Sequence, residues 1–220
     1  MSQQSTLPVI RKALGEDWKA LGEIVRRHYD ISPGTRSNMT IEGLMSEVYH
    51  SPIGKLFLLP GRLFGALVPY KGRDIPTRVR NWTQPDDGNS MFWHRTLRFP
   101  GRRPVIFRSR MVHVGGDEII EYVRFGLGIR MRLSVRDAAL VFESVGYIWD
   151  IGGLRLSIPA WAILGDAVIV EKPLSDNTFH IDFVIRHPLF GRTFSYAGTF
   201  AITQSVADDE IPAQARSSGG

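Results

Sequence analysis

The chain has 220 residues, a length that suits one large domain, and its hydrophobic (43%) and charged (22%) fractions exclude wholesale disorder. It contains no cysteine, which excludes disulfides, thiolate catalysis, zinc–thiolate sites and iron–sulfur clusters and fits a reducing cytoplasm. A formal charge of +5 is compatible with nucleic-acid binding, but the basic residues are scattered along the chain, so we expect no such partner.

The N-terminal third is predicted to hold a tail, two helices and one strand. Residues 1–8 are polar and lack the pattern of a secretory signal, so we expect a flexible tail on a cytoplasmic protein. Apolar residues recur near helical spacing over 9–29, and a strand is expected over 38–49. The lipophilic stretch 53–70 is interrupted by Lys55, Pro60 and Arg62, so it predicts a core-facing helix over 53–68, with a membrane-surface helix as the alternative.

From Arg73 onward the apolar residues alternate with polar ones, a pattern typical of β-strands. Short turn sequences join the segments, which predicts a large antiparallel meander curled into a barrel or half-barrel, with the two N-terminal helices packed on it or plugging it. We therefore expect a mainly β (α+β) fold, with one domain over 9–204 and a flexible tail over 205–220. A single helical turn is expected within 158–164. The predicted strands are 76–84, 90–99, 104–114, 117–126, 128–136, 139–149, 153–158, 166–173, 178–187 and 192–203.

The predicted hairpin around Gly115–Gly116 contains a candidate catalytic carboxylate. Pairing across this turn sets Arg110 opposite Glu121, on a register that is otherwise apolar. Glu121 is thus a candidate acid–base group, with Arg110 as a holder of an anionic substrate group. A buried structural ion pair is the alternative interpretation, and the sequence favours it.

The next hairpins predict an aromatic wall. A turn at Asp137–Ala138 sets Arg132 opposite Glu143, and alternation then places Glu143, Tyr147 and Trp149 on one face. A wall of aromatic side chains with one charged pair is typical of small-molecule pockets, so Glu143 is a second catalytic candidate, and Tyr147 and Trp149 are candidates for substrate binding. Ordinary core with a satisfied salt bridge is an equally good interpretation.

The hairpin over 179–200 holds several polar side chains that resemble a catalytic cluster. Pairing across its loop places His180, Asp182 and Arg186 on the solvent face, with His187 exposed at the loop. Only Tyr196 points inward among phenylalanines, where its hydroxyl needs a partner or a ligand, so it is the third catalytic candidate. The expected cross-strand pairs are Ile185–Phe194, Phe183–Tyr196, Ile181–Gly198, Phe179–Phe200, Arg186–Thr193, Asp182–Ala197 and His180–Thr199.

Motifs with a strong mechanistic meaning are missing from the sequence. There is no phosphate-binding P-loop, no nucleophile elbow and no H-x-x-x-H or H-E-x-x-H pair. We therefore expect neither a cofactor nor a metal site.

Several segments occur in a recognisable order: WHRTLRF (93–99), FRSRM (107–111), EYVRFG (121–126), LSIPAW (156–161) and the hairpin 179–200. Together they resemble a bacterial family of unknown function whose members occur alone or at the C-terminus of saccharopine-dehydrogenase-like proteins. The resemblance spans about residues 10 to 203 and implies no established activity. Within this pattern, Trp93, Glu121 and Tyr196 are hard to explain by backbone needs alone, and we add Trp93 and Trp161 to the candidates for substrate binding.

Two hypotheses of different classes follow. The first is a cofactor-independent cyclase or isomerase, pericyclase-like, that folds a hydrophobic natural-product or lipid-like substrate inside the barrel. The second is a non-catalytic carrier or sensor of hydrophobic ligands, with membrane contact through 53–70 as a minor possibility. A role as an interaction module for a dehydrogenase-like partner follows only from the resemblance. We expect a monomer or homodimer, and the sequence leans slightly toward the enzyme.

Overall fold

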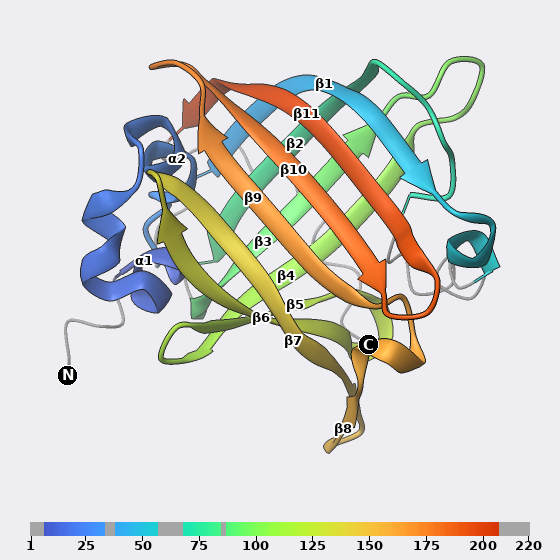
Figure 1. Ribbon diagram of the computed structural model, residues 1–220. Helices are drawn as coiled ribbons and strands as arrows, with labels where there is room; N and C mark the ends of the chain where they lie inside the picture. The colour runs from blue at the N-terminus through green and yellow to red at the C-terminus, as the bar shows by residue number, and fades with distance from the viewer. Residues whose placement is uncertain (1–6, 34–37, 57–67, 85–86, 207–220) are drawn as a thin grey trace.

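The computed structural model describes residues 7–33, 38–56, 68–84 and 87–206. Within these residues the chain forms eleven antiparallel strands in a single sheet (Figure 1). The strands begin and end within a few residues of the predicted ones, because Gly-, Asp- and Pro-containing turns separate them. They are β1 (Asn38–His50), β2 (Ile75–Gln84), β3 (Asp87–Leu97), β4 (Val105–Gly115), β5 (Glu118–Tyr122), β6 (Leu127–Arg136), β7 (Ala139–Ile151), β8 (Leu154–Ile158), β9 (Asp166–Pro173), β10 (Thr178–His187) and β11 (Gly191–Val206).

The sheet closes on itself to form a barrel. Its order is β6-β5-β4-β3-β2-β1-β11-β10-β9-β7-β8, and β6 also pairs with β7, so ten of the eleven strands form a ring. Closure removes the free sheet edges that an open meander of this width would leave. The predicted mainly β barrel is confirmed.

Strand β8 lies outside the ring because β7 divides its second edge between two partners. Residues 140–143 of β7 pair with β9, and residues 147–151 pair with β8. Between these halves the β6–β7 register shifts by a bulge, and Gly146 there has a φ of 132°, which favours glycine. The β7–β8 hairpin consequently projects from one end of the barrel (Figure 1).

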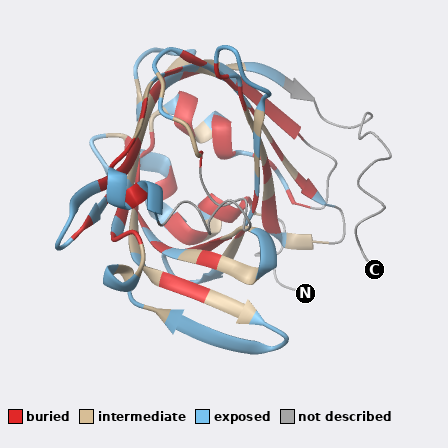
Figure 2. Ribbon diagram, turned by 90° about the vertical axis from the view of Figure 1, so that its right-hand side faces the viewer, coloured by how far each residue is buried: buried red, intermediate tan, exposed pale blue. Residues whose placement is uncertain are grey.

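The N-terminal helices cover the opposite end of the barrel. Figure 2 looks along the barrel and shows them, with their buried faces, across its far end. The predicted continuous helix over 9–29 is wrong: it consists of α1 (Val9–Leu14), the 3₁₀ segment η2 (Gly15–Ala20) and α2 (Glu23–Tyr29). Gly15 ends α1 with a φ of 55°, and Leu21 is extended before Gly22 donates its N–H to the Ala138 carbonyl.

The interior is filled from both the strands and the helices. Each fully buried aromatic side chain contributes on the order of 1.5–3 kcal/mol to stability. The largest fully buried side chains are Tyr29, Phe142, Phe179, Phe194 and Phe200. Two further 3₁₀ turns, η3 (Arg124–Gly126) and η4 (Ala160–Ala162), follow β5 and β8, and η4 matches the single turn predicted within 158–164. The helix predicted over 53–68 and both predicted tails lie largely outside the described residues.

Two predicted registers hold and two differ. The β10–β11 hairpin pairs as predicted, except that a shift at Ile185/Arg186 sets Arg186 opposite Arg192 rather than Thr193. The β6–β7 pairs near the turn also hold. The turn at Gly152–Gly153 predicts the pairs Trp149–Leu154 and Tyr147–Leu156. The β7–β8 pairs are offset from these by two residues, which keeps the same side chains on the same face: Tyr147 pairs with Ile158 and Trp149 with Leu156. The β4–β5 register is wrong by one residue, because a bulge at His113/Gly115 intervenes.

Candidate functional site

A cavity of about 330 Å³ lies inside the barrel. This volume is within the range of small-molecule sites. The lining is dominated by aliphatic and aromatic side chains from the strands, together with Tyr29 from helix α2. The side chains in the lining that carry charge or a hydroxyl group are Tyr29, Arg95, Glu121, Tyr147, Glu171 and Tyr196.

Glu121 on β5 belongs to a buried cluster that spans three neighbouring strands. Arg95 on β3 donates from Nη2 to Glu121 Oε1 at 2.9 Å and from Nη1 to Ser109 Oγ at 2.7 Å. The Ser109 hydroxyl, on β4, donates in turn to the same Oε1 at 2.6 Å. The Glu121 side chain keeps 11% of its surface and that of Arg95 keeps 14%. Because both side chains line the cavity, we assign this remaining surface to the cavity wall.

The predicted pairing of Arg110 with Glu121 is wrong. The bulge at His113/Gly115 shifts β4 by one residue, so Arg110 pairs with Tyr122 and Glu121 pairs with Met111. A one-residue shift moves a side chain to the other face of the sheet. Arg110 therefore points outward, with its guanidinium 5.5 Å from the centre of the Tyr122 ring.

A second buried cluster joins helix α2 to the barrel wall. The Tyr29 hydroxyl donates to Glu171 Oε1 at 2.7 Å, and His28 Nδ1 lies 3.3 Å from Glu171 Oε2. The Asn81 amide nitrogen lies 3.0 Å from His28 Nε2. Burial and the neighbouring Glu171 carboxylate raise the pKa of the Tyr29 hydroxyl well above its ordinary value, so it remains a donor.

Sequence reasoning missed Glu171, although a signal for it exists. On β9, Ala167, Ile169 and Glu171 share one face, and the first two belong to the core or pack against it. A carboxylate in an apolar register is the same pattern that makes Glu121 a candidate. His28 and Tyr29 were predicted only as part of a helix, because nothing local indicates that the end of α2 reaches β9.

Tyr196 on β11 occupies the inward position that was predicted for it. Its ring packs edge-on against Phe183, with centroids 5.0 Å apart, and against Phe194 at 6.1 Å. Among the described residues its hydroxyl has no hydrogen-bond partner, so its polar group faces the cavity unpaired. Burial raises the pKa of Tyr196, and the charges of Arg95, Glu121 and Glu171 all act on it.

The ring order places the clusters across the cavity from one another. In a ring of ten strands, those five places apart face each other, so β5 faces β11 and β3 faces β9. Glu121 therefore projects from the wall opposite Tyr196, and Arg95 from the wall opposite Glu171. Figure 1 shows β9, β10 and β11 in front of β3, β4 and β5.

Three predicted aromatic residues, Trp93, Tyr147 and Trp149, also line the cavity. The Arg95 guanidinium lies 4.5 Å from the centre of the Trp93 ring, and the enclosed Trp93 Nε1 has no partner among the described residues. The Tyr147 hydroxyl donates to the Gly165 carbonyl at 3.0 Å, and burial raises the pKa of Tyr147. Trp149 Nε1 donates to the Phe125 carbonyl at 2.9 Å, so both side chains are held in place.

Glu143 and Trp161 lie outside the cavity. The bulge before Tyr147 changes the alternation of β7, so Glu143 faces outward and accepts a hydrogen bond from Arg136 at 2.7 Å. Arg132, although opposite Glu143 in the register, binds Asp117 and Glu118 instead. Trp161 is 66% exposed on η4. The predicted face shared by Glu143, Tyr147 and Trp149 is therefore wrong.

His187 corrects another prediction. It was expected to be exposed at the loop, but it is only 5% exposed. Its Nε2 lies 2.7 Å from the Trp161 carbonyl, and its Nδ1 accepts the Leu189 N–H at 3.1 Å. His187 thus connects the β10–β11 loop to η4.

The inner face of the β7–β8 hairpin continues the lining of the cavity outward. Its paired side chains become more exposed toward the tip: Tyr147 and Ile158 line the cavity, followed by Trp149 with Leu156 and by Ile151 with Leu154. Leu156 is 42% exposed and Leu154 is 60% exposed. We name these six residues the apolar ramp. On the opposite face, Arg155 donates to Asp150 at 2.8 Å.

The described residues show neither a metal-binding cluster nor a membrane-spanning helix. They contain no group of three or more His, Asp or Glu side chains arranged to hold a metal ion. No helix within the described ranges has the length and apolar character needed to cross a bilayer.

Comparisons with known proteins give the family of this chain. The chain is 25% identical over 166 residues to the uncharacterized protein YndH of Bacillus subtilis (strain 168), covering 72% of this chain and 80% of that protein. A mutant of the fluorescent protein UnaG matches 75% of this chain and 95% of its own, at 12% identity and a TM-score of 0.33. The S-type phycobiliprotein lyase CPES of Guillardia theta matches 80% and 89%, at 5% identity and a TM-score of 0.36. Residues 21–200 match the family described as "Domain of unknown function (DUF4166)", and the chain belongs to that family.

Proposed function

We propose that this protein binds a hydrophobic small molecule inside the barrel and holds the polar group of that molecule between Tyr196 and Glu121. The observation that carries the proposal is the Tyr196 hydroxyl, which faces an apolar cavity of about 330 Å³ with no partner among the described residues. A hydrogen bond from this hydroxyl to a ligand would contribute about 0.5–1.5 kcal/mol to binding.

Entry is expected at the end of the barrel opposite the helices. Helices α1 and α2 cover one end, and Tyr29 contributes to the cavity lining there. At the other end the apolar ramp leads from solvent to the lining. An apolar ligand that slides along this ramp keeps part of its surface out of water throughout its entry.

Binding is tested with purified protein in two ways. Native mass spectrometry should detect a co-purified small molecule, and the neutral dye Nile red should gain fluorescence on binding. Tyr196→Phe should weaken retention of the co-purified molecule without unfolding the protein. Tyr49→Phe, on the outside of the barrel, is the matched control. Absence of both a co-purified molecule and dye binding would contradict the proposal.

A second candidate is a cofactor-independent isomerase or cyclase in the same cavity. The observation that favours it is an acceptor, Glu121, on the wall opposite a proton donor, Tyr196. The carboxylate would take a proton from the carbon next to a ligand carbonyl while the phenol donates to the carbonyl oxygen. Return of the proton to another carbon completes an isomerisation that needs no co-reactant.

Solvent exchange distinguishes this enzyme from a carrier. In D₂O the isomerase should introduce deuterium into the carbon skeleton of the co-purified molecule, as mass spectrometry would detect. Glu121→Gln should abolish this exchange while binding remains, and Glu143→Gln, whose carboxylate lies outside the barrel, should leave it unchanged. A carrier would bind without exchange. Exchange that persists in Glu121→Gln would remove Glu121 from the catalytic role.

A further inference from the structure

Carboxylates outnumber guanidinium groups among the described residues that line the cavity. Glu121 and Glu171 are two carboxylates, and Arg95 is the one guanidinium among the described lining residues. Arg95 is already engaged, since it donates to both Glu121 and Ser109. The formal charge of this lining is therefore negative.

His28 adds no unpaired cation to this lining. The Asn81 amide nitrogen lies 3.0 Å from Nε2, and Glu171 Oε2 lies 3.3 Å from Nδ1, so both ring nitrogens have partners. Even an imidazolium at this position would be matched by Glu171. In either state the described lining offers no cation that lacks a carboxylate partner.

Two polar groups remain available to a ligand. The Tyr196 hydroxyl has no partner among the described residues, and Glu121 uses only Oε1 for its hydrogen bonds from Arg95 and Ser109. Glu121 Oε2 is an acceptor that needs a donor, whereas Tyr196 is a donor that needs an acceptor. The two groups lie on opposite walls of one apolar cavity.

We infer, on the basis of the proposed function, that the cavity selects hydrophobic molecules with a neutral head group that joins a carbonyl to an N–H or O–H, as a carboxamide does. The carbonyl accepts from Tyr196, and the N–H or O–H donates to Glu121 Oε2. A carboxylate head group is rejected, because it would leave water for a lining whose described guanidinium is already bound to Glu121, and because it has no proton to offer Glu121.

The first experiment compares head groups on one alkyl chain. Dodecanamide and dodecanoate are titrated against Nile red bound to the protein at neutral pH. The amide should displace the dye at a concentration at least about tenfold lower than the carboxylate does. Equal displacement, or better displacement by dodecanoate, would overturn the inference while leaving the proposed binding function intact.

The second experiment reverses the preference. Glu121→Gln keeps the size of the side chain but leaves the Arg95 charge without its carboxylate, so the affinity for dodecanoate relative to dodecanamide should rise at least about tenfold. Glu143→Gln removes the same charge outside the barrel and should keep the wild-type ratio. An unchanged ratio in a folded Glu121→Gln protein would refute the charge argument. If neither probe and no dye bound to the wild-type protein, the proposed function itself would fail.

Discussion

On the outer face of β3, His94 stands in a row of cationic residues that crosses three strands. It pairs with Arg80 on β2 and with Arg108 on β4. Its Nε2 is enclosed and has no partner among the described residues. Burial, followed by the charges of Arg108 and Arg80, lowers the pKa of His94 below its ordinary value of 6.5. The folded protein thus holds this ring in its neutral form.

This position makes stability depend on pH. Because the folded-state pKa is below that of the unfolded chain, the unfolded state binds more protons once the pH falls below about 6.5. The free energy of unfolding should therefore fall as the pH drops from 7 to 5. His94→Gln should lose less stability over this range than the wild type, as urea titrations at both pH values would measure. Arg108→Gln should act in the same direction, and identical pH dependence in all three proteins would contradict the argument.

Single residues also show how far the site was predictable. Trp93, Glu121, Tyr147, Trp149 and Tyr196 line the cavity, and alternation within one strand was enough to place most of them. Their roles in binding or catalysis stay predictions. The hydrogen-bond partners in the site could not be predicted from the sequence. Arg95 on β3 contacts Glu121 on β5, and Glu171 receives its hydrogen bond from a helix about 140 residues earlier in the chain. Such contacts depend on tertiary structure, which local patterns do not encode.

Among the elements, the segment between η4 and β9 depends on a glycine. Gly165 has a φ of 107°, and a Cβ there would meet the Arg186 carbonyl and the His187 Cα. Gly165→Ala should therefore lower the free energy of unfolding by about 3 kcal/mol or more, since backbone strain and a backbone clash add. Gly101→Ala, at a φ of 66° in open space, should cost only about 1 kcal/mol. Equal losses in urea unfolding would contradict the close approach at Gly165.

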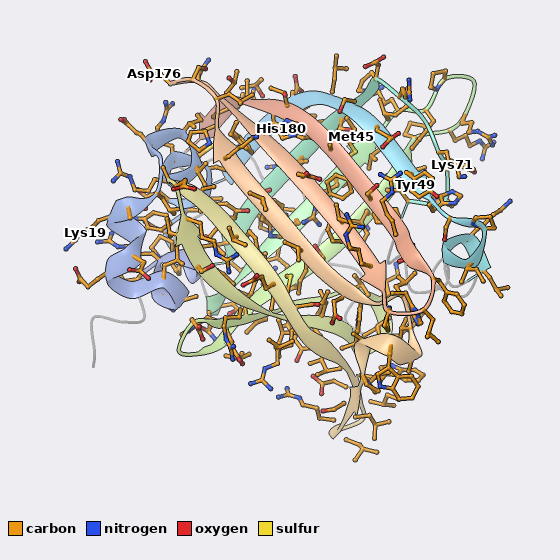
Figure 3. All side chains as sticks on the ribbon, viewed as in Figure 1. Lys19, Met45, Tyr49, Lys71, Asp176 and His180 are labelled. Atoms are coloured by element: carbon orange, nitrogen blue, oxygen red, sulfur yellow. The ribbon has the colours of Figure 1, made fainter. Side chains whose placement is uncertain are left out.

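The apolar ramp supports a kinetic prediction. Leu154→Ser combined with Leu156→Ser should slow Nile red uptake several-fold, because the dye loses the apolar path that lowers its cost of leaving water. The equilibrium affinity should change less, since both leucines lie outside the cavity lining. Leu174→Ser is the control: it is 54% exposed in the β9–β10 turn, whose Asp176 is labelled at the helix end in Figure 3. Stopped-flow fluorescence measures the rates, and equal rates in all variants would place the entrance elsewhere.

The elements were predictable where the information is local. Turn residues and two-residue alternation located the strands, and the β10–β11 pairs follow from its loop. The failures that displaced candidate site residues occur at bulges. One extra residue near His113 turned Arg110 outward, and another near Gly146 separated Glu143 from Tyr147. A bulge leaves little trace in a single sequence, yet it reverses every side chain that follows it.

At the scale of the whole molecule, ligand binding and stability are linked. A ligand that binds only the folded barrel, at a free concentration 100 times its Kd, should raise the free energy of unfolding by about 2.7 kcal/mol. For a chain of this length the Tm should rise by roughly 5–10 °C. Differential scanning calorimetry with dodecanamide measures the rise, and Tyr196→Phe at the same ligand concentration should show a smaller one. A saturating ligand that left Tm unchanged would not be binding the native cavity.

From the sequence alone, a closed barrel and a half-barrel were equally compatible with the predicted strands. Two pairings complete the ring: β1 with β11, from opposite ends of the chain, and β6 with β7. The second is a short hairpin that local signals predict. The first joins residues about 160 positions apart, and only the need to cover both sheet edges argues for it in advance.

Strand β7 pairs with β9 over one half and with β8 over the other, so the β7–β8 hairpin is separate from the β7–β9 pairing that holds the ring together. In the ring, β7 pairs with β6 from Ala139 to Trp149 and with β9 over 140–143, whereas β8 pairs with β7 alone among the described strands. Insertions, deletions or exchanges at Gly152–Gly153 therefore leave the ring intact. Relatives can diversify this hairpin, and engineers can graft new hairpins there, to change which molecules are admitted without redesigning the fold.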